Sequence, residues 1–189
     1  MKTIHILFSL LFVLAGVSSL FAQGFTAPAE GKAVIYIVRP TDYGFAVSFE
    51  FFNNDKYIGV FKGKNYMRYE CDPGEQLIWA SSENKEFVTC DLQAGGTYIL
   101  QVDVIMGAMK ARVGFTTFGA SDNERFQRAK DLIMKEPPVE ISQDKIDDMN
   151  KKLDKFINEQ LQKYNDVWKS EKNFKHISAD MAIPEEAMK

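Results

Sequence analysis

The stretch NNDKYIGVFKGKNYMRYECDPGEQLIWASSENKEFVTCDLQAGGTYILQ, residues 53–101, decides the fold. It consists of short segments in which apolar and polar residues alternate, and turn-forming residues interrupt it at close intervals. The interruptions are Asn53-Asn54-Asp55, Lys62-Gly63-Lys64, Asp72-Pro73-Gly74-Glu75, Glu83-Asn84-Lys85 and Ala94-Gly95-Gly96. Such spacing is typical of hairpins in antiparallel β-sandwiches and barrels. The stretch therefore predicts an architecture, and it carries no obvious chemistry.

The same pattern extends in both directions and predicts about eight strands within residues 31–118. The segment 32–39 is apolar on both faces, which favours a central position, while 45–52 alternates phenylalanines with small or polar residues. We expect a mainly β domain, an antiparallel β-sandwich. The expected strands are Lys32–Arg39, Phe45–Phe52, Lys56–Phe61, Asn65–Cys71, Gln76–Ser82, Glu86–Leu92, Thr97–Ile105 and Lys110–Phe118.

The composition changes after Gly119, and residues 121–189 are predicted to form a C-terminal helical extension. A first helix is expected over 121–135, beginning at Ser121, and a second, longer helix after Ser142; residues 174–189 are expected to be irregular. The second helix carries apolar residues at steps of three and four, which indicates one apolar face. This apolar stripe is Ile146, Met149, Leu153, Ile157, Leu161, Tyr164 and Trp168. It predicts either packing on the sandwich or a surface that binds a partner.

Residues 1–22 have the pattern of a secretory signal peptide, because Lys2 precedes an apolar run and small residues lead to Ala22. We expect cleavage near Ala22 and export to the periplasm or cell surface of a bacterium. An uncleaved anchor is the alternative, since the apolar run approaches the length that spans a bilayer. No cysteine lies near the cleavage point, so no lipid anchor is expected.

The chain has two cysteines, Cys71 and Cys90. An oxidising compartment permits a disulfide between them. A hairpin through Asn84 would place Cys90 opposite Ile78, near the turn that Cys71 enters. We predict this disulfide; the alternatives are two buried free thiols and a nucleophilic cysteine. A nucleophile requires a nearby cationic group, and His176 is far away in the sequence.

Other candidates for chemistry are weak. His176, Ser178 and Asp180 form the only local set that resembles a hydrolytic triad, and a tail is a poor place for preorganised groups. The aspartates of 144–148 begin a helix, where carboxylates complement the helix dipole, and they lack the pattern of a calcium loop. The formal charge of −3 offers no basic surface for nucleic acid. We therefore predict no catalytic residue, no metal and no cofactor.

Several motifs recur in a recognisable order. They are Ala33-Val34-Ile35-Tyr36 with Arg39-Pro40, Asn53 through Ile58-Gly59, Tyr66, Pro73-Gly74, and Leu92-Gln93-Ala94-Gly95 with Tyr98. Over about residues 31–118 this order resembles the bacterial envelope family described as domain of unknown function 2846, and the Pro-Gly hairpin is similar to that of PEGA-type surface modules. The resemblance implies a β-sandwich in an exported protein, often a lipoprotein. It supplies no catalytic residues, and the helical extension lies outside it.

Together these features predict an exported, non-enzymatic envelope protein that acts as a binding or assembly module. The alternative is a structural or accessory subunit that associates with itself through the apolar stripe. A third class, an envelope hydrolase, is disfavoured because no triad or metal-ligand pattern is present. The expected partners are another envelope protein or a second copy of the chain.

Overall fold

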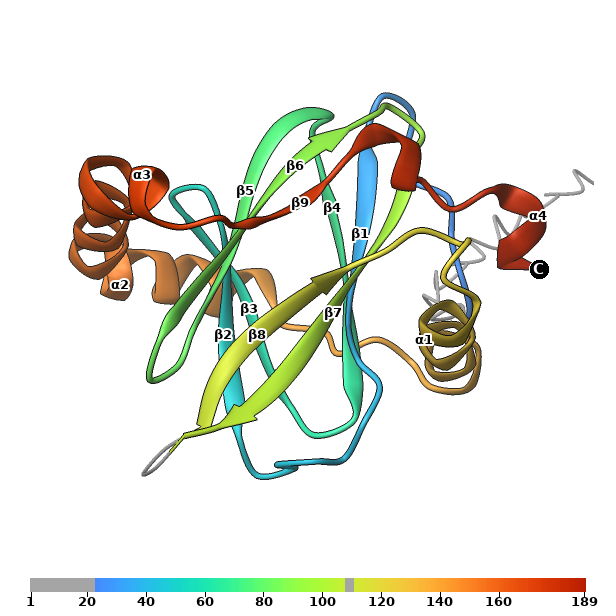
Figure 1. The fold of residues 1–189 in the computed structure, drawn as a ribbon, viewed down its shortest axis with the longest axis horizontal. Coiled ribbons are helices and arrows are strands. Elements are labelled where there is room, and N and C mark those ends of the chain that lie inside the picture. Colours follow the sequence, from blue (N-terminus) through green and yellow to red (C-terminus); the bar gives the residue numbers. More distant parts are fainter. Residues whose placement is uncertain (1–22, 108–110) are drawn as a thin grey trace, which may run out of the picture.

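The computed structural model describes residues 23–107 and 111–189, which form two β-sheets with helices on their outer faces (Figure 1). The strands are β1 (Ala33–Arg39), β2 (Ser48–Asn53), β3 (Lys56–Lys62), β4 (Asn65–Cys71), β5 (Gly74–Ser81), β6 (Lys85–Leu92), β7 (Thr97–Met106), β8 (Ala111–Thr117) and β9 (Lys175–Ile177). The helical segments are α1 (Asn123–Lys135), α2 (Gln143–Lys163), the π-helical turn η1 (Tyr164–Trp168), α3 (Lys169–Glu171), the 3-10 turn η2 (Ala179–Met181) and α4 (Glu185–Met188).

The fold is mainly β, as predicted, but its sheets are mixed. Sheet A has the strand order β4-β1-β7-β8, and sheet B has the order β3-β2-β5-β6-β9. The strands β1 and β7 run parallel, with Val34 beside Thr97, and β6 and β9 also run parallel. The prediction of purely antiparallel pairing is therefore wrong for these two pairs. Alternation shows which face of a strand is buried and says nothing about which strand lies beside it.

The chain buries apolar side chains in three separate layers. A central core lies between the sheets and includes Ile35, Phe51 and Leu100. On the outer face of sheet A, Val34 and Tyr36 pack with residues of α1, and on the outer face of sheet B a further cluster packs with α2. Figure 1 shows α1 and α2 on opposite sides of the pair of sheets. Because both of its faces are covered, β1 is buried along its whole length, which explains its unbroken apolar sequence.

Three local predictions need correction. Strand β2 begins at Ser48 rather than Phe45, because the loop before it is held by the Arg39 guanidinium, which donates to the carbonyl oxygen of Val47 at 2.8 Å. Helix α1 begins at Asn123 rather than Ser121, because the Asp122 side chain caps it by accepting from the Arg125 N–H. The tail predicted to be irregular contains β9, the ninth strand of the described residues.

The predicted signal peptide, residues 1–22, and the first residue of the predicted eighth strand, Lys110, lie outside the described residues. Within 23–107 and 111–189, none of the helices combines the length and the apolar character needed to cross a bilayer.

Candidate functional site

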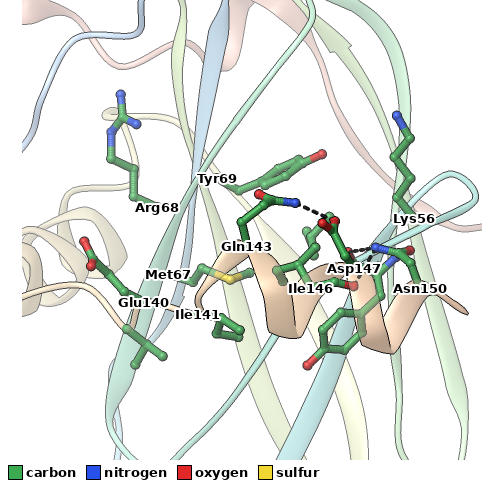
Figure 2. A pocket seen from close by; sticks show the side chains of 13 residues that line it. Lys56, Met67, Arg68, Tyr69, Glu140, Ile141, Gln143, Ile146, Asp147 and Asn150 are labelled. Atoms are coloured by element: carbon green, nitrogen blue, oxygen red, sulfur yellow. Dashed lines mark hydrogen bonds between the residues drawn. The ribbon is translucent and has the colours of Figure 1, made fainter. Parts of the chain in front are cut away.

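A groove of about 710 Å³ lies between two strand edges of the described surface. Its walls are residues 56–58 of β3, 67–69 of β4, the linker 139–141 and residues 143–150 at the start of α2. Figure 2 shows the side chains that line this edge groove. It exists because β3 and β4 follow one another in the chain yet end sheets B and A, respectively, so their facing edges do not pair.

The β3 edge of the groove is closed by one side chain of α2. The Asn150 carboxamide oxygen accepts from the Tyr57 N–H at 2.8 Å, and its nitrogen donates to the Tyr57 carbonyl at 3.2 Å. The same nitrogen donates to the carbonyl of Ile146 at 3.0 Å. Asn150 thus takes the place of a neighbouring strand and satisfies backbone groups that an edge strand leaves unpaired. This pairing also fixes the start of α2 against sheet B.

The β4 edge is closed at one point only. The Val139 N–H donates to the Tyr66 carbonyl at 2.8 Å, so the backbone groups of Tyr66 point away from β1. In an antiparallel ladder this direction alternates, and Arg68 and Glu70 therefore direct their N–H and C=O groups outward as well. In residues 23–107 and 111–189, no backbone hydrogen bond joins these groups to another segment. The β4 edge thus stays open beside the groove.

The side chains of the groove carry both charges. Arg68 and Lys56 contribute cations, and Glu140 and Asp147 contribute anions. The Arg68 guanidinium donates at 3.0 Å both to the Glu70 carboxylate and to the Ala27 carbonyl. Asp147 accepts from the Gln143 amide at 2.8 Å (Figure 2). The groove therefore offers hydrogen-bond donors and acceptors of both signs in an open setting.

An aromatic ring forms part of the β4 wall. Tyr69 is half-buried, and its hydroxyl oxygen accepts from the Asn53 amide at 3.1 Å. Burial raises the pKa of Tyr69 above its ordinary value. The phenol is therefore neutral at physiological pH and acts as a hydrogen-bonding group.

The apolar stripe packs against the chain's own sheet. Ile157 and Tyr164 are buried, and the other members are partly buried against Phe52, Trp79 and Phe87 on the outer face of sheet B. The Tyr164 ring stacks on Phe87 with centroids 4.7 Å apart. In this structure the seven residues therefore belong to a packing face, and a partner-binding role for their exposed parts stays a prediction.

Cys71 and Cys90 are free, buried thiols. They enter the central core from opposite sheets, and Cys90 lies opposite Gln76 rather than Ile78. The predicted disulfide is thus not part of this structure, and its formation in an oxidising compartment stays a prediction. Burial raises the pKa of Cys71 to about 11 and that of Cys90 to about 12, which keeps both thiols protonated and poorly nucleophilic.

His176 lies on β9 and pairs with sheet B. Its Nδ1 is 2.9 Å from the Thr89 hydroxyl oxygen, whereas the hydroxyl of Ser178 donates to the carboxylate of Asp180. The triad-like sequence is thus divided between two separate contacts. His176 also lines a second hollow, of about 510 Å³, with the carboxylates Glu75 and Asp91. No group of three or more His, Cys, Asp or Glu in the described residues is arranged to hold a metal ion.

Sequence analysis did not identify the edge groove. Of its residues, Ile146 and Asp147 were named as part of the apolar stripe and of the aspartates that begin the second helix, and residues 56–58 as part of a recurring motif, but none was connected with a groove. One signal was available, because Asn150 is a polar residue one helical turn after Ile146 on the apolar face. The role of Val139 could not be predicted from the sequence, because its hydrogen bond to Tyr66 depends on the path of the linker.

Comparisons of this chain with protein-family models, with curated proteins and with solved structures found no match.

Proposed function

We propose that this chain is an exported, non-enzymatic envelope module that binds an extended polypeptide segment in the edge groove. The observation that carries the proposal is the open backbone edge of β4 at Arg68 and Glu70, which continues from the bond already made by Val139. A strand edge of this kind recognises a peptide by adding it to the sheet, with backbone hydrogen bonds supplying much of the affinity.

The chemistry of the groove favours a polar segment with charged residues of both signs. Lys56 lies on the β3 wall, while Glu140 and Asp147 lie on the linker and α2. A peptide placed along β4 would direct alternate side chains towards these groups. Charge matching would then select the sequence and direction of the bound segment.

The two-sheet unit also supports the cellular part of the proposal. We infer that residues 31–118 are a sandwich module of the type found in domain of unknown function 2846, because two sheets enclose a shared core in this part of the chain. The signal-peptide pattern of residues 1–22 supports export. A module in the envelope that holds an extended segment of another protein would act in assembly.

The experiment separates backbone pairing from side-chain recognition at one residue. A displayed library of short linear peptides is selected on the protein purified after export, and the selected peptides are measured by fluorescence anisotropy. Arg68→Pro removes the outward N–H, which edge strands tolerate because that N–H is not part of the ladder. Arg68→Ala keeps the N–H and removes the same charged side chain. Arg68→Pro should bind the peptides about tenfold more weakly than Arg68→Ala, because it also loses a backbone hydrogen bond and close contact with the added strand.

Amide hydrogen exchange supplies the second measurement. A bound strand should slow exchange at Arg68 and Glu70, while Tyr66, whose N–H already donates to the Asn65 side chain at 3.1 Å, should change little. Near-UV circular dichroism establishes that both variants are folded. Equal affinities of the two variants, or peptides that leave exchange at Arg68 and Glu70 unchanged, would refute strand addition.

A further inference from the structure

Four large apolar side chains are exposed together at one end of the molecule, away from the edge groove. Tyr43 is 60% exposed and Phe45 is 71% exposed in the loop between β1 and β2. Ile105 is 51% exposed and Met106 is 58% exposed at the end of β7. Figure 1 shows the loop and the β7–β8 hairpin at the same end of the sheets. We call these four residues the apolar tip.

One close approach places the loop beside β7. A Cβ at Gly44 would lie 2.9 Å from Val104, so the loop rests directly on β7. Met106 follows Val104 by two residues and therefore lies on the same face of the strand, one step further out. Ile105 lies on the opposite face of the strand, so the four residues include side chains on both faces of the end of β7.

The loop is held rigidly by a buried cation. The Arg39 guanidinium is fully buried and donates to the carbonyl oxygens of Tyr43 and Gly44, besides that of Val47. It also lies over the Phe49 ring at 5.6 Å. Burying a charge is costly unless hydrogen bonds compensate it. The three hydrogen bonds of Arg39 all go to carbonyls of the loop. They fix the loop backbone in a conformation that leaves the Tyr43 and Phe45 side chains exposed.

The turn beside the loop is basic. The turn between β3 and β4 carries the exposed Lys62 and Lys64, and it contacts the loop through Gly63, whose added Cβ would lie 3.6 Å from the Phe45 carbonyl oxygen. Arg112 is the cross-strand neighbour of Ile105, and it shares a hollow with the carboxylates of Glu83 and Glu86. The one acidic residue of the loop, Asp42, already accepts from the Lys64 N–H at 3.4 Å.

We propose that the apolar tip is a membrane-contact surface that inserts Tyr43 and Phe45 into the interface of an anionic bilayer. Aromatic side chains favour the headgroup region, and basic residues beside them are attracted to anionic lipid. Such contact needs no lipid anchor, and it stands independently of peptide binding in the edge groove.

The test is vesicle binding by the full chain, expressed with its N-terminal segment and purified after export. Sedimentation compares vesicles of phosphatidylcholine alone with vesicles of equimolar phosphatidylcholine and phosphatidylglycerol. Intact mass first establishes that every preparation has the same N-terminus. The double variant Tyr43→Ser/Phe45→Ser should bind the anionic vesicles at least about tenfold more weakly than the unchanged protein. Lys62→Glu/Lys64→Glu should also bind them more weakly, and added salt should reduce binding by the unchanged protein.

A matched control and a depth measurement make the result decisive. Val167→Ser changes a residue that is 41% exposed on η1, away from the tip, and should bind like the unchanged protein. In Phe45→Trp, the new indole should shift its emission to the blue and be quenched by brominated lipid. Equal binding by the tip variants and the Val167 variant would overturn the proposal. So would equal binding to both vesicle types, or a tip-dependent dimer in light scattering without lipid.

Discussion

At the scale of single residues, Tyr66 connects sheet A to the linker that forms one wall of the edge groove. The side chain is fully buried, and its hydroxyl donates to the Glu136 carbonyl at 2.9 Å and lies 3.3 Å from the Ile133 carbonyl. Its own carbonyl accepts from Val139. One residue therefore anchors both the end of α1 and the start of the linker, and its phenol does so only while it is protonated.

We predict that the protein loses stability in alkaline solution through this residue. Burial raises the pKa of Tyr66 to about 12 from an ordinary value of 10.0. Since the unfolded chain releases its phenolic proton first, stability is fully present below pH 10.0 and falls as the pH rises towards about 12. Burial raises the pKa of Tyr57 to about 12 as well, so the two residues act in the same direction. Urea unfolding followed at increasing pH measures this decline.

The matched variants are Tyr66→Phe and Tyr43→Phe. Tyr66→Phe leaves the carbonyls of Ile133 and Glu136 without this donor and should cost about 1–3 kcal/mol at neutral pH. The same variant should show a shallower decline above pH 10.0, because one titrating group is gone. Tyr43→Phe alters an exposed phenol and should behave like the unchanged protein. A decline as steep in Tyr66→Phe as in the unchanged protein would mean that Tyr66 does not titrate in this way.

At the scale of elements, two asparagine side chains close strand edges. Asn150 pairs with both backbone groups of Tyr57 on β3. Asn84, in the turn between β5 and β6, does the same for Val113 on β8, with both distances at 2.8 Å. Edge strands otherwise offer their backbone groups to other chains. The β4 edge differs from the edges of β3 and β8, because no asparagine side chain bonds to the outward backbone groups of Arg68 and Glu70 in the described residues.

We predict that Asn150→Ala destabilises the protein by about 1–3 kcal/mol, because the Tyr57 backbone groups lose both of their partners. The start of α2 should also become more mobile. Asn158→Ala is the matched control, since Asn158 lies on the same helix and bonds only to the exposed Asp154 side chain. Urea unfolding compares the two variants, and hydrogen exchange at Tyr57 reports the local effect. Equal stability of both variants would show that water replaces Asn150 at no cost.

The sequence predicted elements where turns and alternation are both strong. The bounds of β4 were predicted correctly, because the turn Lys62-Gly63-Lys64 and the turn at Pro73-Gly74 bracket it. Prediction was wrong at the start of β2, where 45–47 alternate like a strand but are bent by bonds from Arg39. It missed β9, because three residues are too few to show a period. For the edge groove the sequence offered one signal, Asn150 on the apolar face, but the groove itself depends on two unpaired strand edges and a linker that meet in space.

At the scale of the whole molecule, the helical extension is part of the same packing as the sheets. Trp79 and Phe87 on sheet B lie under α2 and η1, and Val34 and Tyr36 on sheet A lie under α1. All four side chains are fully buried. Uncovering each would forfeit about 1.5–3 kcal/mol of burial free energy. The sheets therefore depend on residues 121–189 for the cover of their outer faces.

We predict that a chain lacking residues 121–189 does not fold cooperatively. It should aggregate or bind a hydrophobic dye strongly, because two apolar sheet faces are exposed at once. A chain lacking only 185–189 is the control, since it loses α4 and keeps α1, α2 and the bond from the Ile183 N–H to the Thr97 carbonyl. Soluble yield, size-exclusion chromatography and thermal unfolding compare the two. A monomeric, cooperatively unfolding 1–120 chain would show that the sheets form an independent domain.

The parallel pairing of β1 with β7 has a consequence for the order of folding. The first strand of the chain occupies the interior of sheet A, with β4 on one side and β7 on the other. Strands β2 to β6 lie between β1 and β7 in the sequence, so the contacts of β1 with β7 are long-range. Such contacts slow folding, because a large loop must close before they form. As the chain emerges from a ribosome or a translocation pore, β1 appears first and must wait for β7. The most apolar strand can pair with β4 early, but one of its two edges stays open until β7 has been made, and that interval is when the nascent chain most needs a chaperone.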